Sequence, residues 1–194
     1  AECIDKGATI IAVDPRFSTA ASKAQHWLAI KPATDMALLL AWMHVLIYEN
    51  LYDKEYVELY GQGFDKLKEH VRGFTPEWAY GITTIKPEEI RKTARVMAEA
   101  APAVIVHPGR HVTWYGDDSQ RGRAVALLNA LLGSWGRRGG FYFKESLKIP
   151  SFPHPPYPEP KWGWHEIGEN FPFAEMGITN EIIKASIPGG NDKY

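Results

Sequence analysis

The sequence predicts an α/β fold in which helices flank an open, Rossmann-like parallel sheet. Residues 9–13 and 103–107 form two short, almost wholly apolar runs, which are typical of strands buried on both faces of a parallel sheet. Residues 26–30 predict a further short strand, and longer helical segments separate the runs. Strands that alternate with helices favour this fold class.

The helices are predicted from their caps and from their apolar periodicity. Thr34 precedes the apolar run that starts at Met36 and is placed to cap a helix, with Asp35 in its first turn. Thr75 gives a second start signal because proline follows it, and glycines from Gly133 onward end the last helix. The predicted helices cover residues 36–49, 53–60, 64–71, 87–100 and 119–132, with a short one starting at residue 76.

Composition limits the class of protein. The chain has 194 residues, of which 45% are apolar and 23% charged, as in an ordinary soluble globular protein. A formal net charge of −1 gives no reason to expect nucleic acid or an anionic membrane as a partner. No apolar run approaches the roughly 20 residues that span a bilayer, and no secretion signal is visible. We expect residues 1–147 to form the α/β domain and residues 148–194 to form an irregular segment rich in proline and aromatic residues.

Metal chemistry within this chain is disfavoured. Cys3 is the single cysteine, so the chain cannot by itself build a zinc site, an iron–sulfur cluster or an internal disulfide. His107 and His111 are four residues apart, but the proline and glycine between them disfavour a helix that presents both to a metal. Residues 1–7 read as the end of a helix that leads directly into a strand, as expected of a piece of a longer protein.

Polar residues end the first apolar run and suggest a ligand site. Asp14 lies where a parallel strand ends, which is the edge of the sheet at which open α/β folds bind ligands. In dinucleotide folds an acid at this place accepts hydrogen bonds from a ribose, and Arg16 beside it suits a phosphate. The alternative is a plain Asp-Pro turn that leaves Asp14 solvated.

Two further segments are expected at the same edge. The loop before residue 36 offers Asp35 and the amide groups of a helix start, and residues 107–110 follow the later apolar run and carry Arg110. Two acids, two arginines and helix amides in one crevice suit a large phosphorylated nucleotide. The chain has no G-x-S-x-G elbow, no Walker loop and no G-x-G-x-x-G, which disfavours the enzyme classes that use them.

Two stretches carry a resemblance to a known family. IIAVDPRFSTAASKAQHWLAIKPATDMALLLAWMHVLI and HPGRHVTWYGDDSQRGRAVALLNALLGSWGRRGGFYF resemble the α/β cofactor-binding domain of molybdopterin oxidoreductases, and most closely the catalytic subunits of polysulfide and thiosulfate reductases. The match covers about residues 5–143. It implies an oxidoreductase that uses molybdenum bis(molybdopterin guanine dinucleotide), with a 4Fe–4S cluster elsewhere in the intact subunit.

The resemblance also assigns residues. It places a guanine dinucleotide arm of the cofactor at residues 14–18 and 33–35, and the pterin near Arg110 and Trp114. Arg110 is then a catalytic candidate that holds an anionic substrate, or equally a phosphate partner of the cofactor, while Arg123 is expected to be structural. The implied cofactor-binding residues are Asp14, Pro15, Arg16, Phe17, Ser18, Ala33, Thr34, Asp35, Gly109 and Trp114, with no metal ligand among them.

Departures from the family pattern bear on the expected activity and on the expected substrate. The metal-ligand segment, the four-cysteine motif and the C-terminal domain of the family have no counterpart here, so this chain alone is expected to be inactive. Residues 141–144 read FYFK where formate dehydrogenases carry a different segment, which favours reduction of a sulfur compound such as polysulfide or thiosulfate in anaerobic respiration.

The resemblance implies partners and a location as well. The partners are the remainder of the catalytic subunit, an iron–sulfur electron-transfer subunit and a membrane-anchor subunit. The location is the periplasmic or cell-envelope side of a prokaryote, with membrane association through partners and a cytoplasmic location left open. Two alternatives remain from the residues themselves: a stand-alone nucleotide-binding α/β module without redox activity, and a purely structural domain.

Overall fold

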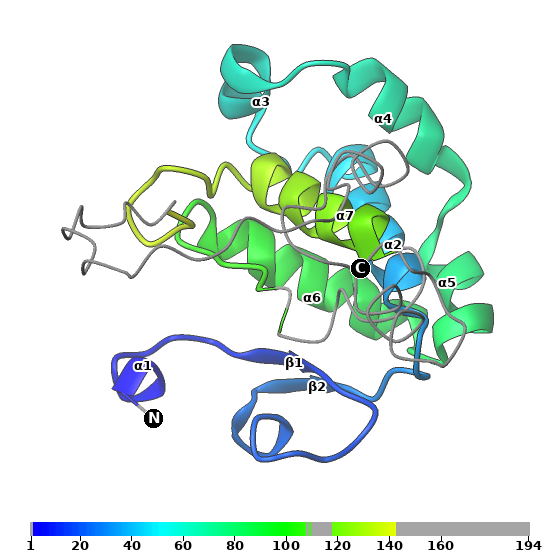
Figure 1. Ribbon diagram of the computed structural model, residues 1–194, viewed down its shortest axis with the longest axis vertical. Helices are drawn as coiled ribbons and strands as arrows, with labels where there is room; N and C mark the ends of the chain where they lie inside the picture. Colours follow the sequence, from blue (N-terminus) through cyan, green and yellow to red (C-terminus); the bar gives the residue numbers. More distant parts are fainter. Residues whose placement is uncertain (1, 108, 110–117, 143–194) are drawn as a thin grey trace, which may run out of the picture. The chain divides into compact units, whose positions relative to one another are not determined.

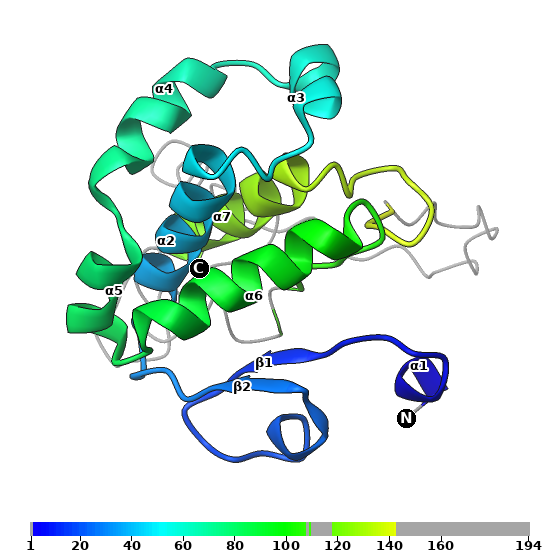
Figure 2. The same ribbon diagram turned by 180° about the vertical axis from the view of Figure 1, so that it is seen from behind.

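The computed structural model describes residues 2–107, 109 and 118–142, all within the first of two units, Ala1–Glu145 (Figures 1 and 2). The first elements are α1 (Glu2–Asp5), β1 (Ile11–Val13), a 3₁₀ turn (Ala21–Lys23) and β2 (His26–Leu28). The later helices are α2 (Asp35–Tyr48), α3 (Lys54–Tyr60), α4 (Phe64–His70), α5 (Pro76–Thr83), α6 (Pro87–Ala100) and α7 (Asp118–Leu131), with a second 3₁₀ turn at Val71–Gly73. The predicted α/β class is confirmed, whereas the predicted division at residue 147 stays a prediction.

The sheet within the described residues has two parallel strands. Ile11 of β1 pairs with His26 of β2, and Val13 pairs with Leu28. The first strand was expected to be buried on both faces, and this expectation is wrong: only Ala12 is buried, while Ile11 and Val13 are half-buried. The reason is that no described strand lies beyond β1, so one long side of the strand is open.

Helix α2 lies at the centre of the packing. Nine of its fourteen residues are buried, and they cover most of the helix circumference, apart from a line through Met36, Leu40, His44 and Tyr48. Helices α5, α6 and α7 contact α2, and Leu28 and Ile30 of the β2 segment join the same buried cluster. A helix that buries most of its circumference must be covered on several sides, so α2 dictates where its neighbours pack.

Two of the short helices around this core begin at side-chain caps, and the cap at Thr75 was predicted. The Thr75 hydroxyl accepts a hydrogen bond from the Trp78 N–H (3.2 Å), with Pro76 in the first turn, as predicted. The Asp53 carboxylate accepts from the Tyr56 N–H (2.9 Å) at the start of α3 and also pairs with Arg137 (2.6 Å). That ion pair attaches the start of α3 to the glycine-rich loop that follows α7.

Residues 103–107 are not a strand, and this prediction is wrong. The segment is extended, but side chains rather than another strand satisfy its backbone. The buried Asn129 amide donates to the Val106 carbonyl (2.9 Å) and accepts from the Val106 N–H (2.9 Å), and the Ser134 hydroxyl donates to the Val104 carbonyl (2.6 Å). Without a described strand beside it, an apolar extended segment has no ladder to join.

Two further predictions concern the strand at residues 26–30 and the C-terminal segment. The strand expected at residues 26–30 is shorter, because it ends at Leu28. The segment 148–194, rich in proline and aromatic residues, lies outside the described residues. Among the described helices, none has the length and apolar character needed to cross a lipid bilayer.

We predict that Gly133→Ala destabilises the fold by about 1–3 kcal/mol, because Gly133 has a left-handed φ of 62°. A Cβ there would also lie 2.5 Å from Asp53 Oδ2. Gly81→Ala is the matched control: Gly81 is exposed within α5, its Cβ would meet nothing, and alanine favours helix by about 0.5–1 kcal/mol. Urea unfolding measures the free energy of unfolding, which should fall in Gly133→Ala and rise in Gly81→Ala. An equal change in both variants would contradict the role given to Gly133.

Candidate functional site

Asp14 organises the turn that follows β1. Its own N–H donates to the Leu28 carbonyl (3.2 Å), which extends the pairing of the two strands by one residue. Its Oδ1 accepts from the Arg16 N–H (2.9 Å), so the carboxylate folds the chain back on itself within two residues. The Ser18 N–H then donates to the Arg16 carbonyl (2.8 Å) and completes a compact turn at the carboxyl end of the strand.

These hydrogen bonds lower the pKa of the Asp14 carboxyl below its ordinary value of 3.8. The largest cause is the hydrogen bond from the Arg16 N–H, followed by one from the Ser18 side chain, and the Arg16 charge adds to them. Asp14 is therefore a carboxylate throughout the neutral range. A carboxylate offers about four acceptor positions, so acceptor capacity remains for a ligand donor.

Trp27 is a neighbour of this turn that sequence reasoning did not single out. Its indole N–H donates to the Asp14 carbonyl (2.9 Å), and its ring meets Phe17 edge-on with centroids 4.9 Å apart. Both rings are exposed, Phe17 to 64% and Trp27 to 39%. The sequence of β2 could have indicated that Trp27 is exposed. Alternate residues of a strand face opposite sides, and Trp27 lies between His26 and the buried Leu28.

The loop after β2 holds the second predicted group of residues. The Lys31 N–H donates to the Thr83 carbonyl at the end of α5 (3.0 Å), which attaches the loop to the helical core. Ala33 has a left-handed φ of 64°, a conformation that non-glycine residues rarely adopt and that clusters at functional sites. The half-buried Asp35 begins α2, as expected.

The predicted capping role of Thr34 is wrong. Thr34 occupies the cap position of α2, but its side chain accepts no hydrogen bond from the helix. Its hydroxyl donates instead to the Lys31 carbonyl (2.6 Å), because the left-handed Ala33 turns the loop back toward residue 31. The hydroxyl therefore shapes the loop, and the first amides of α2 are not capped by it.

The third predicted segment is described only in part. The Gly109 N–H donates to His107 Nδ1 (2.9 Å), and Gly109 has a left-handed φ of 69°, which favours glycine at this turn. Arg110 and Trp114 lie outside the described residues. Arg123, expected to be structural, is exposed on α7 and donates to Gln120 (3.0 Å).

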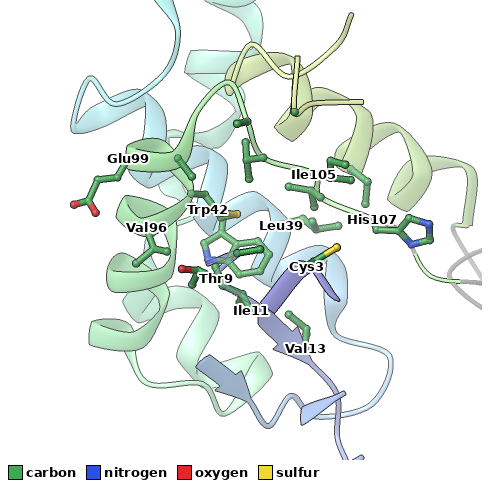
Figure 3. A pocket seen from close by; sticks show the side chains of 18 of the residues that line it. Cys3, Thr9, Ile11, Val13, Leu39, Trp42, Val96, Glu99, Ile105 and His107 are labelled. Atoms are coloured by element: carbon green, nitrogen blue, oxygen red, sulfur yellow. The ribbon is translucent and has the colours of Figure 1, made fainter. Parts of the chain in front are cut away.

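One cavity lies next to parts of these segments. It has a volume of about 980 Å³, and its lining includes Val13 from the end of β1, Asp35 from the start of α2 and His107 from the third segment. Figure 3 shows Val13 and His107 on the same side of this cavity, with Leu39 and Trp42 of α2 between the two flanking segments. Among the predicted site residues that the structure describes, only Asp35 lines this cavity, so the prediction that the three segments form one site stays a prediction.

The described residues supply acceptors, cations and amides rather than a metal site. Across residues 2–107, 109 and 118–142, no three His, Cys, Asp or Glu side chains come close enough to hold a metal ion. Cys3 is an exposed free thiol that lines the cavity. Arg16 is exposed and forms no salt bridge with any described residue, so its guanidinium is available to an anion.

The profile of the family "Molybdopterin oxidoreductase" matches residues 2–170, which is most of the chain. The chain belongs to the molybdopterin oxidoreductase family. Its resemblance to this family is thereby confirmed, and membership implies a molybdenum–pterin cofactor in the intact enzyme.

Individual relatives agree with the family assignment. The chain is 41% identical over 145 residues to the thiosulfate reductase molybdopterin-containing subunit PhsA of Salmonella typhimurium, covering 75% of this chain and 19% of that protein. It is 39% identical over 131 residues to formate dehydrogenase H of Escherichia coli, covering 68% of this chain and 18% of that protein. The chain thus spans about a fifth of the length of these relatives.

A solved structure supports the fold as well. Acetylene hydratase from Pelobacter acetylenicus superposes with a TM-score of 0.68 at 34% sequence identity, covering 72% of this chain and 19% of that chain. Its name and those of the other two relatives denote different reactions. The shared domain is therefore compatible with several substrates.

We predict that Ser18→Ala raises the pKa of Asp14, because the variant removes one of the hydrogen bonds that favour the carboxylate. Ser22→Ala is the control, since the Ser22 hydroxyl donates to the Thr19 carbonyl (3.0 Å) and not to Asp14. NMR of the Asp14 carboxyl carbon across an acid titration measures the pKa of Asp14 in both variants. An Asp14 pKa that is the same in Ser18→Ala and in the unsubstituted chain would contradict the geometry of the turn.

The same pKa shift makes stability depend on pH with a defined sign. The folded-state pKa of Asp14 lies below the unfolded value near 3.8, so the ionised turn stabilises the fold above that value. This contribution is lost as the pH falls through the folded pKa. Unfolding measured between neutral and acid pH should therefore show a smaller acid-induced loss in Ser18→Ala than in Ser22→Ala.

Proposed function

We propose that this domain binds one guanine dinucleotide arm of a molybdenum bis(molybdopterin guanine dinucleotide) cofactor. The observation that carries the proposal is the Asp14 turn, an ionised acceptor at the carboxyl end of a parallel strand with the exposed Arg16 close by. Open α/β folds bind ligands at this edge of the sheet. The Rossmann-like architecture expected from the sequence belongs to the same proposal.

The residues present fit such a group. A guanosine offers N–H and O–H donors, which a carboxylate accepts, and its phosphates suit a guanidinium and unoccupied backbone amides. Asp14 and Arg16 supply the first two, and the start of α2 supplies amides that no side-chain cap occupies. Their nearness to the cavity bordered by Val13 and Asp35 gives an extended ligand room to continue toward residue 107.

Each segment then has a defined task. Asp14 to Ser18 hold the ribose or base, and Ala33 to Asp35 hold the dinucleotide from the α2 side. Gly109 lets the backbone turn at the third segment, where Trp114 is proposed to contact the pterin. The bound cofactor supplies two-electron redox chemistry at molybdenum, whereas these residues bind and orient it.

We propose an inorganic sulfur compound, polysulfide or thiosulfate, as the substrate of the intact enzyme. The support is the 41% identity to a thiosulfate reductase subunit, together with the FYFK segment at residues 141–144. Arg110 is the proposed substrate contact, because a guanidinium binds sulfur oxyanions through two parallel hydrogen bonds. Its alternative role is as a partner of a cofactor phosphate.

The remaining proposals concern the assembly. We propose that this domain works within a larger catalytic subunit that also carries a 4Fe–4S cluster. An iron–sulfur electron-transfer subunit and a membrane-anchor subunit are its proposed partners, with the complex on the periplasmic or cell-envelope side. The name of the Salmonella relative, a molybdopterin-containing subunit, supports a multi-subunit enzyme.

Asp14→Ala tests the cofactor proposal in the full-length enzyme. Loss of a hydrogen bond to a charged group costs about 1.5–3 kcal/mol, which is roughly a tenfold to hundredfold loss of cofactor affinity. We expect molybdenum per protein to fall while turnover per bound molybdenum changes little. Asp65→Ala is the control, because Asp65 is exposed on α4, away from the β1 turn in Figure 1. Normal molybdenum content with reduced turnover would overturn the assignment.

Arg110→Lys separates the two roles of Arg110. If Arg110 holds substrate, lysine keeps the charge but loses the planar fork, so kcat/KM should fall about tenfold or more with normal molybdenum content. If it holds the cofactor, molybdenum should be lost while turnover per remaining metal stays near normal. Metal analysis beside kinetics measures both, and no change in either would remove Arg110 from the site.

A further inference from the structure

Two exposed aromatic rings lie beside the Asp14 turn. Phe17 and Trp27 meet edge-on, with their ring planes at 63°, and an edge-on contact leaves ring faces open. Phe17 offers water no polar group, and paired aromatic surface of this kind is typical of a binding site. The other exposed phenylalanine, tryptophan and tyrosine side chains of the described residues are all tyrosines, whose hydroxyls can bond to water: Tyr48, Tyr60, Tyr80 and Tyr142.

The indole ring of Trp27 is held in one position. Its residue pairs with Ala12 in the parallel ladder, and its indole N–H donates to the Asp14 carbonyl (2.9 Å). A tryptophan side chain has only two rotatable bonds, so this one hydrogen bond fixes the ring. A ring that is fixed before a ligand arrives loses little conformational freedom when the ligand stacks on it.

The turn after β1 positions Phe17. This residue lies between Arg16, whose N–H donates to Asp14 Oδ1 (2.9 Å), and Ser18, whose N–H donates to the Arg16 carbonyl (2.8 Å). The Ser18 hydroxyl also accepts from the Ala21 N–H (3.3 Å), which connects the turn to the 3₁₀ turn that follows it. An aromatic ring, a carboxylate and a guanidinium therefore belong to one short, hydrogen-bonded segment.

The carboxylate beside the rings favours one kind of occupant. Asp14 is ionised, so a wholly apolar partner would cover the rings but deprive the carboxylate of water without offering it a donor, which is costly. A guanine base combines a π-face with N–H donors on its edge, so it can stack on a ring and also donate to a carboxylate. The exposed Arg16 lies in the same segment and suits a phosphate of the same ligand.

We propose that Phe17 and Trp27 form the stacking site for the guanine base of the dinucleotide, with Trp27 contributing most because its ring is larger and is fixed by its N–H. This inference rests on the proposed function, and it adds a residue, Trp27, and a contact that the hydrogen bonds of the turn do not supply. Stacking of a base on an aromatic side chain raises affinity about fivefold to 150-fold. Neither ring lines the cavity beside β1, so the stacking site lies outside that cavity.

Binding of two probes to the full-length enzyme without its cofactor tests the proposal. GMP carries the base, whereas ribose 5-phosphate lacks it. In Trp27→Leu we expect the affinity for GMP to fall at least about fivefold and that for ribose 5-phosphate to change less than about twofold, as measured by ligand-observed NMR. Trp27→Phe keeps a ring but has no N–H, so it should bind GMP nearly as well as the unsubstituted enzyme.

Two further variants complete the set. Phe17→Leu should also weaken GMP binding without changing the affinity for ribose 5-phosphate, by a smaller factor than Trp27→Leu. Tyr60→Leu is the matched control, because Tyr60 is exposed and meets the ring of Tyr56 with centroids 4.9 Å apart, as far as Phe17 from Trp27. It lies on α3, away from the β1 turn in Figure 1, and its loss should leave GMP affinity unchanged.

Several results would overturn the stacking site. An equal loss of affinity for both probes in Trp27→Leu, or a loss of GMP affinity in Trp27→Phe as large as in Trp27→Leu, would mean that Trp27 acts only through its hydrogen bond to Asp14. Unchanged GMP affinity in Trp27→Leu, or no GMP binding by the unsubstituted enzyme, would assign the rings to another partner. Each result is compatible with a loss of molybdenum in Asp14→Ala, so failure of the stacking site is distinguishable from failure of the proposed function.

Discussion

The burial of α2 is the constraint on which the rest of the structure depends. This helix buries most of its circumference, so it needs partners on several sides. Helices α5, α6 and α7 cover most of it, and the Trp42 indole N–H finds a buried acceptor in the Thr93 hydroxyl of α6 (2.9 Å). The side toward β1 carries the cavity, where Leu39 and Trp42 form part of the lining.

The position of the candidate site follows from this packing. β2 is held to the core through Leu28 and Ile30, and β1 is held to β2, so the ends of both strands point toward the start of α2. The loop between β2 and α2 is short and attached to α5 at Thr83, which leaves Ala33 in a strained conformation. Strain at this loop is tolerated because the elements on both sides of it are rigidly packed.

The domain separates two tasks of a molybdenum enzyme. In the proposed function, a carboxylate, an arginine and backbone amides of its described residues bind and orient a large anionic ligand, and none of these groups performs redox chemistry. Relatives with different reactions share the domain, which is expected when the reacting metal and its ligand are supplied elsewhere. Under the same proposal, Arg110 is the residue of this chain that would contribute to substrate choice.

By itself, the sequence determined the helices, the two N-terminal strands and the edge of the sheet at which Asp14 lies. These follow from local signals: apolar periodicity, caps such as Thr75, and an acid directly after an apolar run. Tertiary structure decided which partner each backbone segment and polar side chain finds, because local sequence signals do not contain this information. Residues 103–107 have the composition of a buried strand, but a strand exists only beside another strand, and Asn129 occupies its one satisfied edge. Thr34 has the composition of a cap, but the left-handed turn at Ala33 directs its hydroxyl to Lys31.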